Sequence, residues 1–229
     1  IKEIYKNYIS KFSYLIYGSF LFVLIQCAGL KYQFGNFTIS NIDVITYYAY
    51  LGAKSDALEK NEDFKKIWLS RTNEIYSLKS PEKKKLAVSD LTNQLQHNSS
   101  NLIKAYFLNL FENATTGDIN TNDCKNVKQT NYFNYLKELF YEITKWQNVI
   151  FSVIGYFLSV YFLLIGLAKK TEIQYAFIAF FILYIFLTSG ISCSEGNRFN
   201  VITFPFIILL LGKFIQEKTA LISNKNTFS

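Results

Sequence analysis

Hydrophobic and polar residues follow one another along this chain in long blocks, and four of the hydrophobic blocks are almost free of charge. They are Phe12–Leu30, Val149–Ala168, Ile173–Cys193 and Phe199–Ile215. A helix needs about 20 mostly apolar residues to cross the hydrocarbon core of a bilayer, and each block reaches or approaches that length. The pattern therefore predicts an all-α integral membrane protein with about four transmembrane helices.

A long polar insertion, residues 31–148, separates the first block from the second. The segment Ser80–Glu82 has the residues of a helix start, with a capping serine, a proline in the first turn and an acidic side chain. Apolar residues then recur at helical spacing along Ala87–Leu95, Leu102–Phe111 and Tyr132–Ile143. Asn113–Asn131, rich in Asn, Thr, Asp and Gly, is typical of an irregular loop. The insertion is therefore expected to be mostly helical.

Lysines near the ends of the apolar blocks predict the orientation. With four spans, one side of the membrane receives Lys2, Lys6, Lys11, Lys169, Lys170, Lys213, Lys218 and Lys225. Cytoplasmic loops carry an excess of basic residues, so that side and both termini should be cytoplasmic. We expect four regions: a basic flank and helix over residues 1–30, an extracytoplasmic insertion over 31–148, three helices over 149–215 and a cytoplasmic tail over 216–229.

Composition narrows the classes of function. Half of the 229 residues are hydrophobic, with 22 Phe and 17 Tyr, and the formal net charge is +7. The lysines are dispersed and form no basic groove motif, which argues against nucleic acid as a partner. The three cysteines have no zinc or redox spacing, so the sequence names no cofactor and leaves a requirement for a divalent metal open.

The last two apolar blocks are separated by a short polar turn, Ser194–Arg198, that would lie at the outer membrane face. Charged groups beside hydrocarbon are costly unless they pair, reach water or bind a charged ligand. Glu195 and Arg198 could form an ion pair that seals a hairpin. Alternatively, the planar guanidinium of Arg198 could hold the phosphate of a lipid. Pro205 predicts a kink in the following helix that would open a cavity beneath the turn.

Three segments, taken in order, resemble a group of membrane glycosyltransferases of the GT-C superfamily, the protein O-mannosyltransferase and aminoarabinose-transferase group. Glu195–Phe199 followed by Pro205-Phe206 is similar to the C-terminal signature of that group, although Phe199 stands where the group often has Tyr. Tyr47–Gly52 is similar to an aromatic segment that ends in Gly at the start of the late outer loop. Phe107–Asp118 is similar to the end of that loop.

The resemblance implies transfer of a hexosyl or pentosyl group from a lipid-linked, polyprenyl-phosphate donor to an acceptor on the extracytoplasmic face. Glu195 and Arg198 would then be substrate-binding residues that line the donor-phosphate end of the cavity, and the loop near Asn113–Asp118 could serve the acceptor. The family's acidic catalytic residues belong to a first outer loop that has no counterpart here, so no catalytic residue is identified. The chain would be the C-terminal portion of such an enzyme, completed by an upstream segment or a partner chain.

Two other classes of function stay open at the level of sequence. The chain could be a non-catalytic subunit of a larger, for instance organellar, membrane complex, in which the polar turn is only a hairpin. It could also be a polysaccharide polymerase or ligase, which shares the lipid-linked substrate but usually has more spans. Membrane lipid is an expected partner under all three hypotheses.

Overall fold

The computed structural model describes residues 11–35, 37, 42–117, 131–168, 173–193 and 196–226. All regular structure in these ranges is helical. The elements are α2 (Lys11–Phe34), α3 (Ile42–Thr46), the π-helix η1 (Tyr47–Gly52), α4 (Ala53–Lys60), α5 (Phe64–Ser77), α6 (Ser80–His97), α7 (Ser99–Thr115), α8 (Phe133–Ala168), α9 (Ile173–Ser189) and α10 (Gly196–Asn226). The chain divides into two compact units, Ile1–Leu102 and Ile103–Ser229, with the boundary inside α7.

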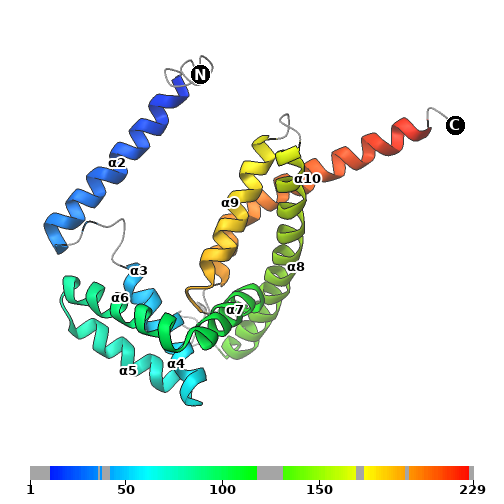
Figure 1. Ribbon diagram of the computed structural model, residues 1–229. Coiled ribbons are helices and arrows are strands. Elements are labelled where there is room, and N and C mark those ends of the chain that lie inside the picture. The colour runs from blue at the N-terminus through cyan, green and yellow to red at the C-terminus, as the bar shows by residue number, and fades with distance from the viewer. Residues whose placement is uncertain are drawn as a thin grey trace. The chain divides into compact units, whose positions relative to one another are not determined.

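In the first unit, η1 packs against α5 and α6 as well as its neighbours in the chain, α3 and α4 (Figure 1). One cluster of apolar side chains is built from Tyr48, Ile75 and Ala87, and a second from Ala53, Ala57 and Ile67. These helices are short, so their stability depends on tertiary packing more than on helix propensity. The π-helix is therefore central to this small fold.

The start of α6 differs by one residue from the sequence prediction. Ser80 was expected to be the N-cap, but the helix begins at Ser80 and Lys79 is the capping residue. The Glu82 side chain accepts a hydrogen bond from the Lys79 backbone N–H at 3.1 Å. Pro81 still occupies the first turn, where its missing N–H costs nothing. The acidic first turn is thus confirmed, while the cap lies one position earlier.

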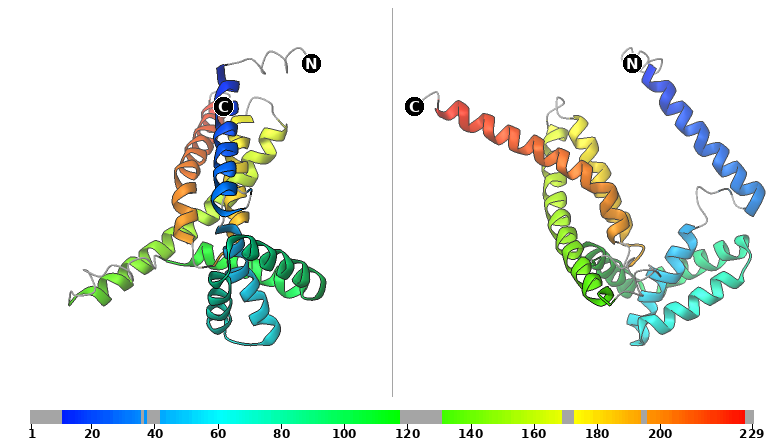
Figure 2. Two further views of the ribbon diagram at one scale, coloured as in Figure 1. Left: turned by 90° about the vertical axis from the view of Figure 1, so that its left-hand side faces the viewer. Right: turned by 180° about the vertical axis from the view of Figure 1, so that it is seen from behind.

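In the second unit, α8, α9 and α10 pack against one another, and they lie side by side in all views (Figures 1 and 2). Their shared core contains Leu158, Phe162, Ala179, Ile182, Ile207 and Leu210. Gly155 of α8 permits close approach, because a Cβ there would lie 2.6 Å from Cδ1 of Ile207. Small residues at such contacts are typical of packed membrane helices.

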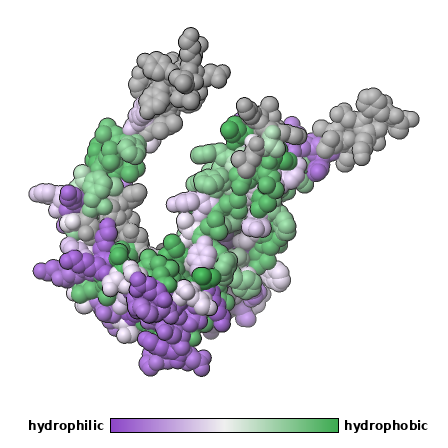
Figure 3. Space-filling model, viewed as in Figure 1, coloured by the Kyte–Doolittle hydropathy of each residue, from purple (hydrophilic) through white to green (hydrophobic). Residues whose placement is uncertain are grey.

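The helices that correspond to the predicted spans differ in length. Two are long and apolar enough to cross a membrane, with candidate spans at Phe133–Gly166 and Phe199–Thr219. Helix α9, Ile173–Ser189, is apolar but shorter, and the expected first span lies in α2. Hydrophobic residues cover much of the visible surface of α8 and α9, whereas hydrophilic residues gather over α4, α5 and α6 (Figure 3).

Candidate functional site

The residues predicted to bind substrate, Glu195 and Arg198, belong to the connection between α9 and α10. Glu195 lies outside the described residues. Arg198 is in the first turn of α10, and its side chain also lies outside the described part. Their chain neighbours Ser189, Phe199 and Asn200 are described, and all three line a cavity.

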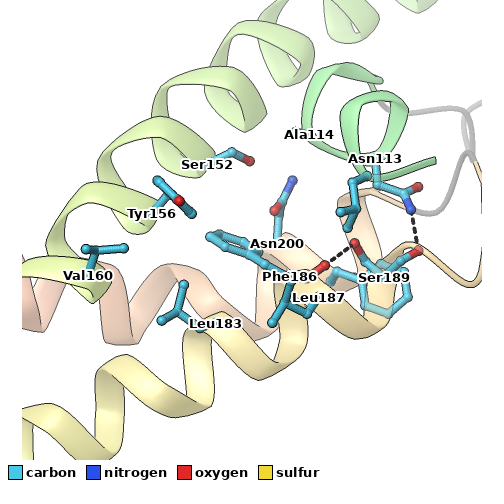
Figure 4. Close-up of a pocket in the computed structure, with 12 residues that line it drawn as sticks. Asn113, Ala114, Ser152, Tyr156, Val160, Leu183, Phe186, Leu187, Ser189 and Asn200 are labelled. Atoms are coloured by element: carbon cyan, nitrogen blue, oxygen red, sulfur yellow. Dashed lines mark hydrogen bonds between the residues drawn. The ribbon is translucent and has the colours of Figure 1, made fainter. Parts of the chain in front are cut away.

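This cavity, which we call the α7–α10 pocket, has a volume of about 430 Å³ (Figure 4). Eight of its twelve lining residues are aliphatic or aromatic, and four are polar but uncharged. The lining consists of Leu110, Asn113, Ala114, Ser152, Tyr156, Val160, Leu183, Phe186, Leu187, Ser189, Phe199 and Asn200. Volume and lining both fall in the range of small-molecule sites, which are mostly apolar with a few placed polar groups.

Helix α7 forms one wall of the pocket. Three of its side chains donate hydrogen bonds to backbone carbonyls at the C-terminal end of α9 and just after it. Tyr106 Oη donates to the Leu187 carbonyl at 2.7 Å, and Asn109 Nδ2 donates to the Gly190 carbonyl at 3.1 Å. Asn113 Nδ2 donates to the carbonyls of Ser189 and Ser192 at 2.8 and 2.9 Å. The last carbonyls of a helix have no partners within it, so α7 acts as a side-chain cap for α9.

Two glycines allow α7 and the residues after it to approach their neighbours. A Cβ at Gly190 would lie 2.5 Å from Cε2 of Tyr106, and a Cβ at Gly117 would fall on the Tyr141 carbonyl of α8. Asn148 of α8 donates from Nδ2 to the Thr116 carbonyl at 2.7 Å, which joins the same segments. The predicted loop Asn113–Asn131 is thus wrong in its first residues, since α7 continues to Thr115; residues 118–130 lie outside the described part.

Two polar atoms of the pocket lining are buried without a hydrogen-bond partner: Ser152 Oγ and Asn200 Nδ2. Asn200 is 3% exposed, and Figure 4 shows its amide in the space between α7 and α8. The other two polar side chains are occupied, because Asn113 binds the end of α9 and Ser189 Oγ donates to the Phe186 carbonyl. A buried amide or hydroxyl without a partner costs about 1–3 kcal/mol.

The first unit contains a second cluster, built around the guanidinium of Arg71. Arg71 forms a two-point ion pair with Asp90, at 2.8 and 3.0 Å, and donates twice to Asp56 Oδ2, at 2.6 and 3.1 Å. Its Nη1 also donates to the Tyr48 carbonyl at 3.1 Å, and its Cζ lies 4.4 Å from the centre of the Tyr48 ring. The guanidinium of this buried cation therefore donates its hydrogen bonds to groups of the same unit.

Further groups complete the cluster around Arg71. Tyr47 Oη donates to Asp90 Oδ2 at 3.1 Å, and Gln94 Nε2 donates to Asp56 Oδ1 and to the Gly52 carbonyl, both at 3.1 Å. Lys60 Nζ, 3.7 Å from Asp56 Oδ2, adds a second positive charge opposite the two carboxylates. Lys60 is largely exposed, so Arg71 is the main counter-charge of both carboxylates.

Arg71 and the two tyrosines keep their protons near neutral pH. Burial by itself would lower the pKa of Arg71, but the hydrogen bonds and charges of Asp90 and Asp56 outweigh it and raise that pKa. Burial, followed by the charge of Asp90, raises the pKa of Tyr47, and burial with the hydrogen bond to Glu74 raises that of Tyr48. The tyrosines stay neutral donors, so the cluster suits a structural role better than proton transfer.

The aromatic segment Tyr47–Gly52 forms the π-helix η1. The wider turn of a π-helix leaves backbone carbonyls open to other donors, and here the Tyr48 and Gly52 carbonyls accept from Arg71 and Gln94. Gly52 has no room for a side chain, because a Cβ would lie 2.7 Å from Arg71 Nη1. The segment singled out in the sequence thus supports the ion cluster.

Among the described residues, no group of three or more His, Cys, Asp or Glu side chains is arranged to hold a metal ion.

Sequence reasoning missed Ser152, Asn200 and the Arg71 cluster. Ser152 is flanked by apolar residues in Val149–Ile154, and that isolation is a signal that could have found it, whereas Asn200 follows the polar turn by only two residues. The members of the Arg71 cluster are far apart in sequence, but only two of the chain's 24 basic residues are arginines, Arg71 and Arg198. At Arg71 the planar fork is used in full, since it binds two carboxylates at once.

In comparisons with known proteins, no family model, no curated protein and no solved structure matches this chain.

Proposed function

We propose that the chain is the C-terminal portion of a membrane glycosyltransferase that takes a hexosyl or pentosyl group from a polyprenyl-phosphate donor. One observation carries the proposal: the segment with Glu195 and Arg198 connects two apolar helices, α9 and α10, that pack together beside the α7–α10 pocket. A carboxylate and a guanidinium at the end of such a bundle suit a charged ligand with an apolar anchor. The acceptor would be on the extracytoplasmic face.

The proposed topology has four transmembrane helices, α2, α8, α9 and α10, with both termini cytoplasmic and the insertion 31–148 extracytoplasmic. The burial of the two candidate spans supports membrane insertion. Only 28% and 22% of the most apolar windows of Phe133–Gly166 and Phe199–Thr219 are buried. A core helix of a soluble protein would have most of such a window buried, whereas a lipid-facing helix exposes its apolar side chains.

Arg198 is proposed to hold the donor phosphate, with Glu195 beside it. A guanidinium binds two phosphate oxygens at once, and Arg198 is one of only two arginines among 24 basic residues. The lining of the pocket has no charged side chain, so the phosphate is assigned to the turn. The acidic residues for catalysis would come from an upstream segment or a partner chain.

The experiment measures binding of geranylgeranyl phosphate to the full chain in lipid nanodiscs. Loss of a charge-assisted hydrogen-bonding group costs about 1.5–3 kcal/mol, so Arg198→Ala should weaken binding by about 10- to 100-fold. Arg198→Lys should restore part of the affinity, and Val201→Ala, which trims an exposed side chain of the same helix, should leave it unchanged. Equal affinity of Arg198→Ala and the unmodified chain would remove the phosphate site from this turn.

A non-catalytic membrane subunit is the second candidate. The first unit favours this candidate, because the charged groups around Arg71 bind one another and have a structural role. This candidate predicts that the chain purifies in a stable complex from its native membrane and shows no response to polyprenyl phosphate. Dissociation of that complex by added lipid-linked sugar would count against it.

A further inference from the structure

The α7–α10 pocket contains two polar groups for which the fold supplies no partner. Two threonine hydroxyls of α8 and α9 bind their own backbone: Thr144 donates to the Phe140 carbonyl at 2.7 Å and Thr188 to the Tyr184 carbonyl at 2.9 Å. Ser152 makes no such bond, and its buried Oγ is unpaired, like Asn200 Nδ2. Buried polar atoms are normally satisfied, so an unpaired pair lining one cavity calls for a ligand.

The chemistry of the lining selects the class of ligand. Eight of the twelve lining residues are apolar or aromatic, and the polar ones are uncharged, so a charged group inside the cavity would have no counter-charge. Asn200 Nδ2 can only donate a hydrogen bond, while a serine hydroxyl can donate and accept. A hydroxyl on the ligand can accept from Asn200 and also exchange a hydrogen bond with Ser152.

We propose that the α7–α10 pocket binds a neutral lipid alcohol, whose hydroxyl hydrogen-bonds Asn200 and Ser152 and whose apolar body lies against α8, α9 and α10. This site is distinct from the phosphate site assigned to Arg198. The proposed alcohol site does not depend on sugar transfer, so it would remain valid if the chain proved not to be a glycosyltransferase.

The test uses the full chain in nanodiscs and two photoreactive probes, a diazirine-bearing hexadecanol and the corresponding hexadecane. Labelled residues are mapped by mass spectrometry. The alcohol should label the pocket lining at least fivefold more than the hydrocarbon does. Asn200→Leu and Ser152→Ala should each reduce that labelling by about 5- to 10-fold, the value of one hydrogen bond.

Matched variants distinguish loss of binding in the pocket from a general effect of mutation on labelling or stability. Ser159 lies on α8, is fully buried and also has an unpaired Oγ, but it does not line the pocket. Ser159→Ala should therefore leave labelling unchanged. Asn200→Leu removes an unsatisfied buried amide and should not lower thermal stability, and Leu183→Phe should block labelling by filling the cavity.

Three results would overturn the proposal. They are equal labelling of the lining by alcohol and hydrocarbon, labelling that survives Asn200→Leu and Leu183→Phe, and no labelling of the lining above that of the exposed helix surface. The last result would mean that water alone satisfies Ser152 and Asn200.

Discussion

Arg71 is the residue on which the first unit depends most. It is 8% exposed and interacts with Asp56, Asp90 and the Tyr48 carbonyl. A buried ion pair adds little net stability compared with apolar residues of the same shape, but removal of one partner leaves the other charges without compensation. The cluster therefore makes the unit sensitive to single changes.

We predict that Arg71→Met destabilises the first unit by about 3–5 kcal/mol, because Asp90 loses its counter-charge and Asp56 keeps only the exposed Lys60. Chemical denaturation of the protein in detergent, followed by intrinsic fluorescence, measures the change.

The control for this prediction is Lys66→Met. Lys66 pairs with Glu62 at 2.9 Å on the exposed surface of α5, where an ion pair contributes little. Loss of this ion pair should leave the midpoint of the denaturation curve unchanged. A similar loss of unfolding free energy in both variants would show that the buried cluster contributes no more to stability than a surface ion pair.

At the scale of elements, the second unit depends on close helix contacts at glycines. Gly155 brings α8 onto Ile207 of α10, and Gly190 brings the end of α9 onto Tyr106 of α7. Close contacts and interhelical hydrogen bonds of this kind are also what holds helices together in membrane proteins.

Gly155→Val should therefore separate α8 from α10. The new side chain overlaps Ile207, and overpacking of this kind costs about 1–3 kcal/mol. The expected result is a lower unfolding temperature and faster hydrogen exchange in peptides of α8 and α10. Gly212→Val is the matched control, because a Cβ at Gly212 meets nothing within 4 Å. A larger effect of the control would contradict this packing.

The elements that sequence predicts well are those that rest on local pattern. Runs of apolar residues predict the helical segments of α8, α9 and α10, and the start of α6 is predicted to within one residue. The apolar stripe Ala87–Leu95 is a poorer guide, because Leu95 is exposed while the buried face of α6 includes Gln94. Its burial depends on partners in η1 and α4, which periodicity does not show.

The site is less predictable than the helices. Glu195 and Arg198 stand out as charges between apolar blocks, whereas the sequence does not show that Asn200 and Ser152 line one cavity formed by four helices. The sequence places Asn113 in a loop, but its amide donates two hydrogen bonds from α7 to carbonyls at and after the end of α9. Such roles depend on tertiary contacts, so spacing along the chain does not show them.

At the scale of the whole molecule, the two compact units should respond separately to mutation. Energetic effects at distant sites without shared partners are usually additive, and proteins open in cooperative parts. The ion cluster belongs to the first unit and the helix core of α8–α10 to the second.

We predict that Gly52→Ala accelerates hydrogen exchange by at least about tenfold in α4–α6 and leaves α8–α10 unchanged. The added methyl group would lie 2.7 Å from Arg71 Nη1 and 3.0 Å from Asp90 Oδ2, so the cluster must shift at a cost of about 1–3 kcal/mol. Mass spectrometry of exchanged peptides measures both regions together. Equal acceleration in both would show that the chain unfolds as one body.

Helix α8 runs without a break for 36 residues, from Phe133 to Ala168. At 1.5 Å per residue it is about 54 Å long, well beyond the roughly 30 Å of bilayer hydrocarbon. If such a helix tilts as one body, residues far from the pivot move the most. A tilt of about 10° around Asn148 would carry Phe133, about 22 Å away, sideways by about 4 Å. In the proposed transmembrane topology, the same tilt would move Ser152 by about 1 Å and Tyr156 by about 2 Å, so a change in bilayer thickness would alter the wall of the pocket.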